Sequence, residues 1–127
     1  CIKEALVRTQ LDQATNIALM SPLVYHDLLY VLDLCDGVAT DSGGITEEAV
    51  SLNKQVIMLR NETDRPEGIA HGHVKLVGTD ERKILDGIAW ILARQPCRPD
   101  HEVSPYGDGY ACERIVAIIK EKIYNTR

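Results

Sequence analysis

The chain has 127 residues, a formal net charge of −5, 45% hydrophobic residues, 5% aromatic residues and no phenylalanine. This length suits one domain, and a core rich in Ile, Leu, Val and Ala is typical of parallel strands covered by helices. Because Lys and Arg are scattered and the net charge is negative, the composition argues against nucleic-acid binding. No apolar run approaches the roughly 20 residues that span a bilayer, and no signal peptide opens the chain, so the sequence predicts a cytoplasmic protein without membrane contact.

The spacing and sequence context of the four cysteines indicate free thiols rather than disulfides. They form no C-x-x-C pair, and Cys35 and Cys112 fall within apolar helical patterns, which predicts buried and reduced side chains. Residues 2–7 have the pattern of a helix. Because the chain opens inside this pattern, we expect it to be a piece of a longer protein.

Short apolar runs alternate with helical patterns along the chain. The runs predict strands over residues 16–20, 37–40, 55–59 and 73–77. The helical patterns cover residues 24–35, 45–52 and 79–95, and a last helix runs to the C-terminus. The first of these helices is dense in apolar residues, which predicts that it is largely buried. A polar loop is expected over residues 60–68.

This alternation predicts the fold class. No hairpin signal separates the strands, so right-handed crossovers and a parallel sheet with helices on both faces are expected. The prediction is a single three-layer α/β domain of Rossmann-like type over residues 1–127. In such sheets, ligands bind outside the carboxyl ends of the strands.

The serine–glycine turn (Ser42, Gly43 and Gly44) follows the second predicted strand and opens a helix. The first N–H groups of a helix lack intrahelical partners and lie at the positive end of its dipole, so they can hold a phosphate. Glycines let an anion approach the backbone, and Ser42 adds a hydroxyl. Glu48, about one turn into the helix, could accept hydrogen bonds from sugar hydroxyls. The turn indicates a nucleotide or phosphate site, with a plain strand-to-helix connection as the alternative.

Arg65 lies in the predicted loop at the same edge of the sheet. Its guanidinium could pair with a diphosphate, although pairing with the nearby Asp64 or Glu67 is the simpler interpretation of the spacing. The pair His71 and His73 has no third ligand at a suitable spacing, so no metal is expected. The sequence contains no G-x-G-x-x-G and no P-loop motif, and we expect no cofactor.

Five ordered motifs carry a resemblance to one family. Residues 40–49 are T-D-S-G-G-I-T-E-E-A, which resembles the T-D-S-G-G-[IL]-x-E-E-A motif of the non-hydrolysing UDP-N-acetylglucosamine (UDP-GlcNAc) 2-epimerases. Four further motifs agree in order: S-L-N-K-Q-V at 51–56, T-D-R-P-E at 63–67, L-V-G-T-D at 76–80 and P-Y-G-D-G at 105–109. The resemblance runs from about residue 16 to the C-terminal helix.

The resemblance implies an architecture and a reaction. Family members have two Rossmann-like domains facing a cleft, as in B-type glycosyltransferases, and this chain resembles the second, UDP-binding domain without the N-terminal one. The implied reaction interconverts UDP-GlcNAc and UDP-N-acetylmannosamine (UDP-ManNAc) by elimination and re-addition of UDP, in a full-length homodimer that serves cell-surface polysaccharide biosynthesis. The turn residues Ser42, Gly43 and Gly44 would contact the diphosphate. Glu48 would hold the ribose, and Arg65 would lie at the UDP edge of the cleft.

The resemblance places the proton-moving carboxylates in the first domain. No catalytic residue is therefore expected in this chain, which alone would be inactive. Leu23 and Leu28 stand where the family often has a polar residue and an aromatic beside the uracil, so the base contact stays open. The alternatives are the donor-nucleotide lobe of a hydrolysing epimerase or of a B-type glycosyltransferase, and a non-catalytic module that binds nucleotide sugars.

Overall fold

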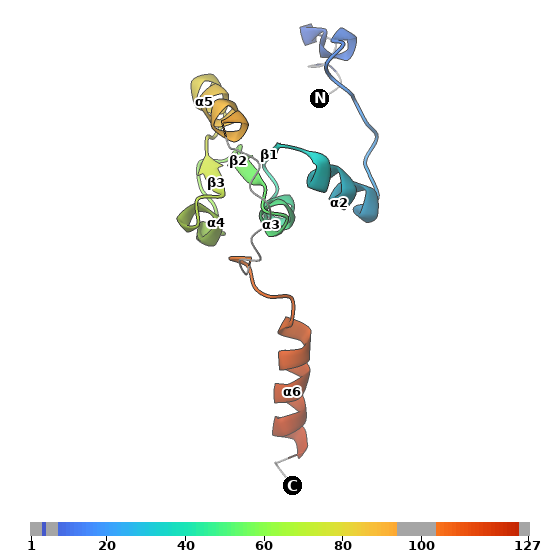
Figure 1. The fold of residues 1–127 in the computed structure, drawn as a ribbon, viewed down its shortest axis with the longest axis vertical. Helices are drawn as coiled ribbons and strands as arrows, with labels where there is room; N and C mark the ends of the chain where they lie inside the picture. Colours follow the sequence, from blue (N-terminus) through green and yellow to red (C-terminus); the bar gives the residue numbers. More distant parts are fainter. Residues whose placement is uncertain (1–3, 5–7, 94–103, 125–127) are drawn as a thin grey trace.

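The computed structural model describes residues 4, 8–93 and 104–124 of the chain. Its strands are β1 (Gly37–Thr40), β2 (Gln55–Met58) and β3 (Val74–Leu76). Its helices are the 3-10 helix η1 (Leu11–Gln13) and the α-helices α2 (Tyr25–Leu34), α3 (Gly43–Ser51), α4 (Pro66–Ala70), α5 (Glu81–Leu92) and α6 (Ala111–Tyr124). Figure 1 shows α3, α4 and α5 around the strands, with α6 projecting away from them.

The three strands form one parallel sheet in the order β1-β2-β3. Val38 of β1 lies opposite Val56 of β2, and Met58 lies opposite Leu76 of β3. The strands predicted over residues 37–40, 55–59 and 73–77 are confirmed to within one residue at each end. The middle strand β2 is buried along its whole length, which explains why its sequence is the most continuous apolar run.

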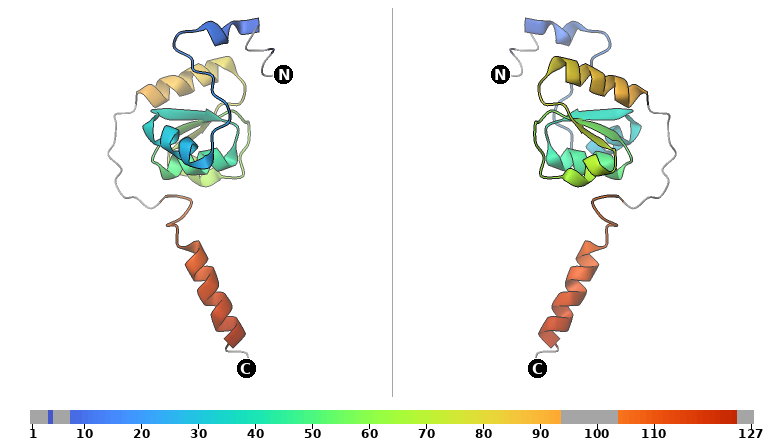
Figure 2. Two further views of the ribbon diagram at one scale, coloured as in Figure 1. Left: turned by 90° about the vertical axis from the view of Figure 1, so that its right-hand side faces the viewer. Right: turned by 90° about the vertical axis from the view of Figure 1, so that its left-hand side faces the viewer.

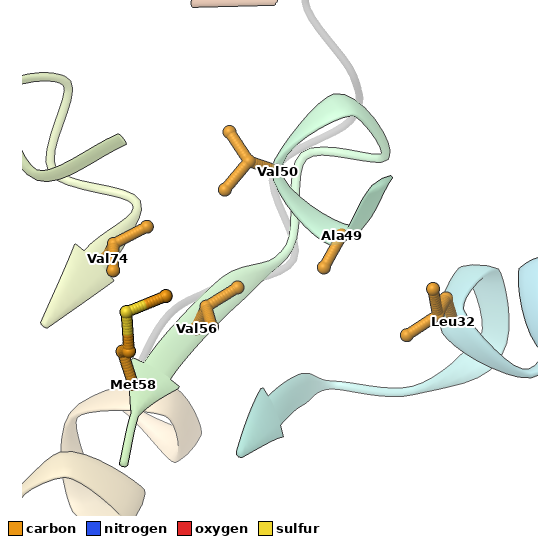
Figure 3. Close-up of a cluster of buried hydrophobic side chains, with 6 residues drawn as sticks. All are labelled: Leu32, Ala49, Val50, Val56, Met58 and Val74. Carbon is orange, nitrogen blue, oxygen red and sulfur yellow. The ribbon is translucent and has the colours of Figure 1, made fainter. Parts of the chain in front are cut away.

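Side chains of β2 alternate between two cores because successive residues of a strand point to opposite faces. Val56 and Met58 join a cluster with residues of α2, α3 and β3 (Figure 3). Ile57 joins a second cluster with Val77 and with Ile91 of α5. Figure 2 shows the sheet between α5 on one side and α3 on the other. The predicted three-layer α/β fold is confirmed.

The strand predicted over residues 16–20 is wrong. The segment joins η1 to α2 without entering the sheet (Figure 1), and Leu19 and Met20 are 53% and 65% exposed. An apolar run becomes a strand only where a neighbouring strand pairs with it. Among the described residues β1 pairs with β2 alone, and the segment does not lie at its other edge.

Helix α2 forms where the pattern predicts it, but the prediction that it is largely buried is wrong. Leu32 is its buried residue, and Leu28 and Leu29 pack against the same core. Tyr30 and Leu34 are 68% and 66% exposed. The described part of the chain covers α2 on the α3 side only, so the remaining apolar residues face outward.

The polar loop predicted over residues 60–68 is shorter than expected, because α4 begins inside it at Pro66. Proline suits the first helical position, where its missing N–H would have no partner, and Pro66 takes that position here. The short loop that remains carries Arg65 as the residue before the helix.

Cys35 and Cys112 are both free, as predicted. Cys35 is partly buried and donates from Sγ to the carbonyl of Leu32 at 3.2 Å, and burial raises the pKa of its thiol. The predicted burial of Cys112 is wrong, because it lies on the exposed helix α6. Cys1 and Cys97 lie outside the described residues. None of the helices in the described ranges is both long and apolar enough to cross a membrane.

Candidate functional site

The serine–glycine turn lies at the carboxyl end of β1 and opens α3, as the sequence predicts. Ser42 is the N-cap, and its Oγ accepts a hydrogen bond from the Ile45 N–H at 3.3 Å. The Ser42 N–H donates to Oγ1 of Thr40 at 3.0 Å. These two bonds fix the direction in which the chain leaves the strand and enters the helix.

The N–H groups of Gly43 and Gly44 are the first two of α3, and neither donates a hydrogen bond within the described residues. A Cβ placed on Gly43 would meet no atom within 4 Å, and one on Gly44 would meet only Ser42 Oγ, at 4.0 Å. Neither glycine has a positive φ. The described chain itself therefore does not require glycine here, and two N–H groups without a partner beside open space at the Cα atoms suit an anion.

Glu48 stands on the second turn of α3, and its carboxylate is already held. The Tyr25 hydroxyl, at the start of α2, donates to Oε1 of Glu48 at 2.7 Å. This hydrogen bond raises the pKa of Tyr25, with smaller contributions from burial and from the charge of Glu48. Sequence analysis missed Tyr25. Its signal was its position in the segment that follows the apolar run at residues 16–20, although that run is not a strand.

Arg65 is bound by two carboxylates. Its Nε donates to Oε1 of Glu47, and its Nη1 donates to Oδ2 of Asp64 at 2.7 Å. The Glu47 hydrogen bond is the main cause of the raised pKa of Arg65, and the charge of Asp64 adds to it. The predicted pairing with Asp64 is confirmed, whereas the second carboxylate is Glu47 of α3 rather than the predicted neighbour Glu67.

Helix α3 brings these groups together. Adjacent residues of a helix point about 100° apart, so Glu47 and Glu48 serve different partners: Glu47 binds Arg65 and Glu48 binds Tyr25. The turn, Glu48 and Arg65 thus lie around one helix, α3. Leu28 packs against the buried core.

The described residues contain no group of three or more His, Cys, Asp or Glu side chains arranged to hold a metal ion. His71 of the H-x-H pair places Nδ1 at 2.8 Å from the carbonyl oxygen of Glu67, one turn earlier.

The fold is that of a Rossmann-like α/β domain of the glycosyltransferase-B type, and known proteins identify its family. Residues 2–120 match the family model described as UDP-N-acetylglucosamine 2-epimerase. The chain belongs to this family.

Individual relatives agree with the family model. The chain is 42% identical over 109 residues to the UDP-N-acetylglucosamine 2-epimerase of Yersinia pestis. The aligned region covers 83% of this chain and 28% of that protein. The S. aureus MnaA–UDP structure is 34% identical with a TM-score of 0.81, over 95% of this chain and 33% of that one.

A third relative was solved with its ligands. Methanocaldococcus jannaschii UDP-GlcNAc 2-epimerase in complex with UDP-GlcNAc and UDP is 31% identical, with a TM-score of 0.79 over 94% of this chain and 32% of that one. The chain spans about 30% of the length of the curated relatives that it matches.

Proposed function

We propose that this chain is the UDP-binding part of an enzyme that interconverts UDP-GlcNAc and UDP-ManNAc, and that the serine–glycine turn holds the diphosphate. The observation that carries the proposal is the pair of N–H groups on Gly43 and Gly44, which have no partner in the described chain, while the space beside both Cα atoms is open. Membership of the family supports the substrate, since the M. jannaschii relative binds UDP-GlcNAc and UDP.

The other polar groups of the site fit the rest of UDP. The Glu48 carboxylate accepts hydrogen bonds and suits the two hydroxyls of a ribose. The Arg65 guanidinium has five N–H donors, and Glu47 and Asp64 use Nε and Nη1. Its Nη2 group is then the donor that we assign to the diphosphate. A planar guanidinium recognises phosphate oxygens in this way.

In the proposed reaction, UDP leaves and returns. The bond between carbon 1 of the sugar and the phosphate oxygen breaks, UDP takes the electron pair, and a base removes the proton from carbon 2 to give a 2-acetamidoglucal. UDP then adds back to carbon 1 while a proton reaches the opposite face of carbon 2, which inverts that centre. The two glycine N–H groups and Arg65 stabilise the negative charge on the departing UDP.

We assign the proton transfers to residues outside this chain and propose that the intact protein is a homodimer. The greater length of the relatives supports the first assignment. Incubation of the intact protein with UDP-GlcNAc tests the chemistry: UDP-ManNAc that retains its nucleotide is expected, whereas free N-acetylmannosamine plus UDP would indicate a hydrolysing enzyme. Sedimentation equilibrium tests the dimer.

Gly43→Ala tests the diphosphate site directly, by calorimetry with UDP on the intact protein. The added methyl group meets nothing within 4 Å in the described chain but occupies the space assigned to the diphosphate. We expect UDP affinity to fall about tenfold or more, which is about 1.4 kcal/mol or more of binding free energy. Thermal stability is expected to be unchanged or higher, because alanine has a higher helix propensity than glycine.

Gly72→Ala is the matched control. Its φ of +74° strains any side chain, so we expect lower stability with unchanged UDP affinity. Wild-type UDP affinity in the Gly43→Ala variant would refute the diphosphate site.

A further inference from the structure

The Tyr25 hydroxyl lies 2.7 Å from the Glu48 carboxylate, and 23 residues separate the two in the chain. We propose that Tyr25 is a positioning residue that orients this carboxylate toward a ribose, and so sets the preference of the site for ribonucleotides over 2′-deoxyribonucleotides. This inference rests on the proposed function, in which Glu48 binds the ribose of UDP.

The packing of α2 on α3 fixes the two groups relative to each other. Leu32 of α2 is 4% exposed, and Ala49, the neighbour of Glu48 on α3, is fully buried in the same cluster (Figure 3). Leu28 and Leu29 pack against that cluster from α2. The backbones that carry Tyr25 and Glu48 therefore stand on one rigid core, and the hydroxyl reaches a defined place.

A single hydroxyl donor leaves most of the carboxylate available. It occupies one acceptor position on Oε1, while Oε2 and the second position on Oε1 stay open to two adjacent sugar hydroxyls. A partly exposed glutamate without this restraint samples several rotamers, and ordering it during binding lowers affinity. The hydrogen bond from Tyr25 orders the Glu48 side chain before the nucleotide binds, so less ordering is required during binding.

A purely structural role for the bond predicts different behaviour. A hydrogen bond that only ties α2 to α3 would contribute to folding and leave nucleotide preference unchanged. Tyr25 is 55% exposed, so water replaces the lost partner when the hydroxyl is removed, and the expected effect on folding is small.

The test is calorimetry on the intact protein with UDP and 2′-deoxy-UDP, for the wild type, Tyr25→Phe, Glu48→Gln and the double variant. We expect Tyr25→Phe to weaken UDP binding about 3- to 10-fold, in the range of the net contribution of a typical intramolecular hydrogen bond, and to weaken 2′-deoxy-UDP binding less. The double variant is expected to match Glu48→Gln, because Tyr25 acts through that carboxylate.

Tyr30→Phe is the matched control, since it removes the same hydroxyl from an exposed tyrosine of the same helix. The inference is overturned if Tyr25→Phe keeps the wild-type ratio of the two affinities while Glu48→Gln loses it, or if Tyr30→Phe changes the ratio as much. If Glu48→Gln itself binds both nucleotides as the wild type does, the ribose assignment of the proposed function fails, and this inference fails with it.

Discussion

Arg65 donates from Nε to the carboxylate of Glu47, a residue 18 positions earlier in the chain. The bond joins the loop before α4 to the middle of α3. Pairs of this kind on a protein surface contribute little to stability, and both side chains are well exposed, at 40% and 38%. The pair matters for where the guanidinium lies, which is beside the helix that carries the serine–glycine turn.

We predict that Arg65→Lys weakens UDP binding about tenfold and leaves uridine binding unchanged. Lysine keeps the charge but lacks the planar fork that can bind Glu47, Asp64 and a phosphate oxygen at once. Calorimetry of the intact protein with UDP and with uridine measures both affinities. Arg60→Lys is the control, because Arg60 is an exposed arginine of the same loop. Equal loss with both ligands would place Arg65 away from the diphosphate.

We predict that Gly87→Ala destabilises the fold by about 1–3 kcal/mol, because it overfills a packed core. A Cβ on Gly87 would lie 2.7 Å from Cγ2 of Ile57 and 3.3 Å from Cγ1 of Val77, and Ile57 is fully buried. Urea denaturation measures the change. The cost is expected to shrink in an Ile57→Ala background, where the space has been emptied; an unchanged cost would locate the strain elsewhere.

Asp108 and Arg114 give a prediction about pH. The Arg114 guanidinium binds both carboxylate oxygens of Asp108 and the Tyr110 N–H donates to one of them, so the pKa of Asp108 lies below its ordinary value, mainly because of Arg114. Such a group stabilises the fold above the ordinary pKa of about 3.9, and the contribution is lost as the pH falls through the lowered folded value.

An NMR titration of the Asp108 carboxyl measures this shift. The midpoint is expected below the ordinary aspartate value in the wild type and is expected to rise in Arg114→Gln. Lys120→Gln, which removes another exposed cation of α6, is expected to leave the midpoint unchanged. An ordinary midpoint in the wild type would show that the pair does not persist in solution.

Local sequence was enough to predict the central part of the fold. Residues 56–59 form a continuous apolar run, which is typical of a strand in a covered parallel sheet, and the strand Gln55–Met58 is buried along its whole length. The serine–glycine turn was equally predictable, because its cap and its glycines act within a few residues. Residues 16–20 have the same apolar character without a neighbouring strand in the described chain, and composition alone does not reveal whether a neighbour is present.

The contacts that define the candidate site were beyond sequence reasoning. Tyr25 meets Glu48 across 23 residues and Arg65 meets Glu47 across 18. Both contacts depend on how α2 and the loop before α4 pack on α3, and spacing in the chain does not encode that packing. The sequence shows that Glu47 and Glu48 are adjacent, but it does not show which partner each of them takes.

Glu47 and Glu48 bind partners on different sides of α3. These two contacts together fix the rotation of the helix about its axis. Deleting one residue between Gly44 and Glu47 would turn the rest of the helix by about 100°. Both carboxylates would then miss their partners, and the buried Ala49 and Val50 would leave the core. This helix therefore tolerates changes of side chain on its outer surface far better than any change of length shorter than a full turn.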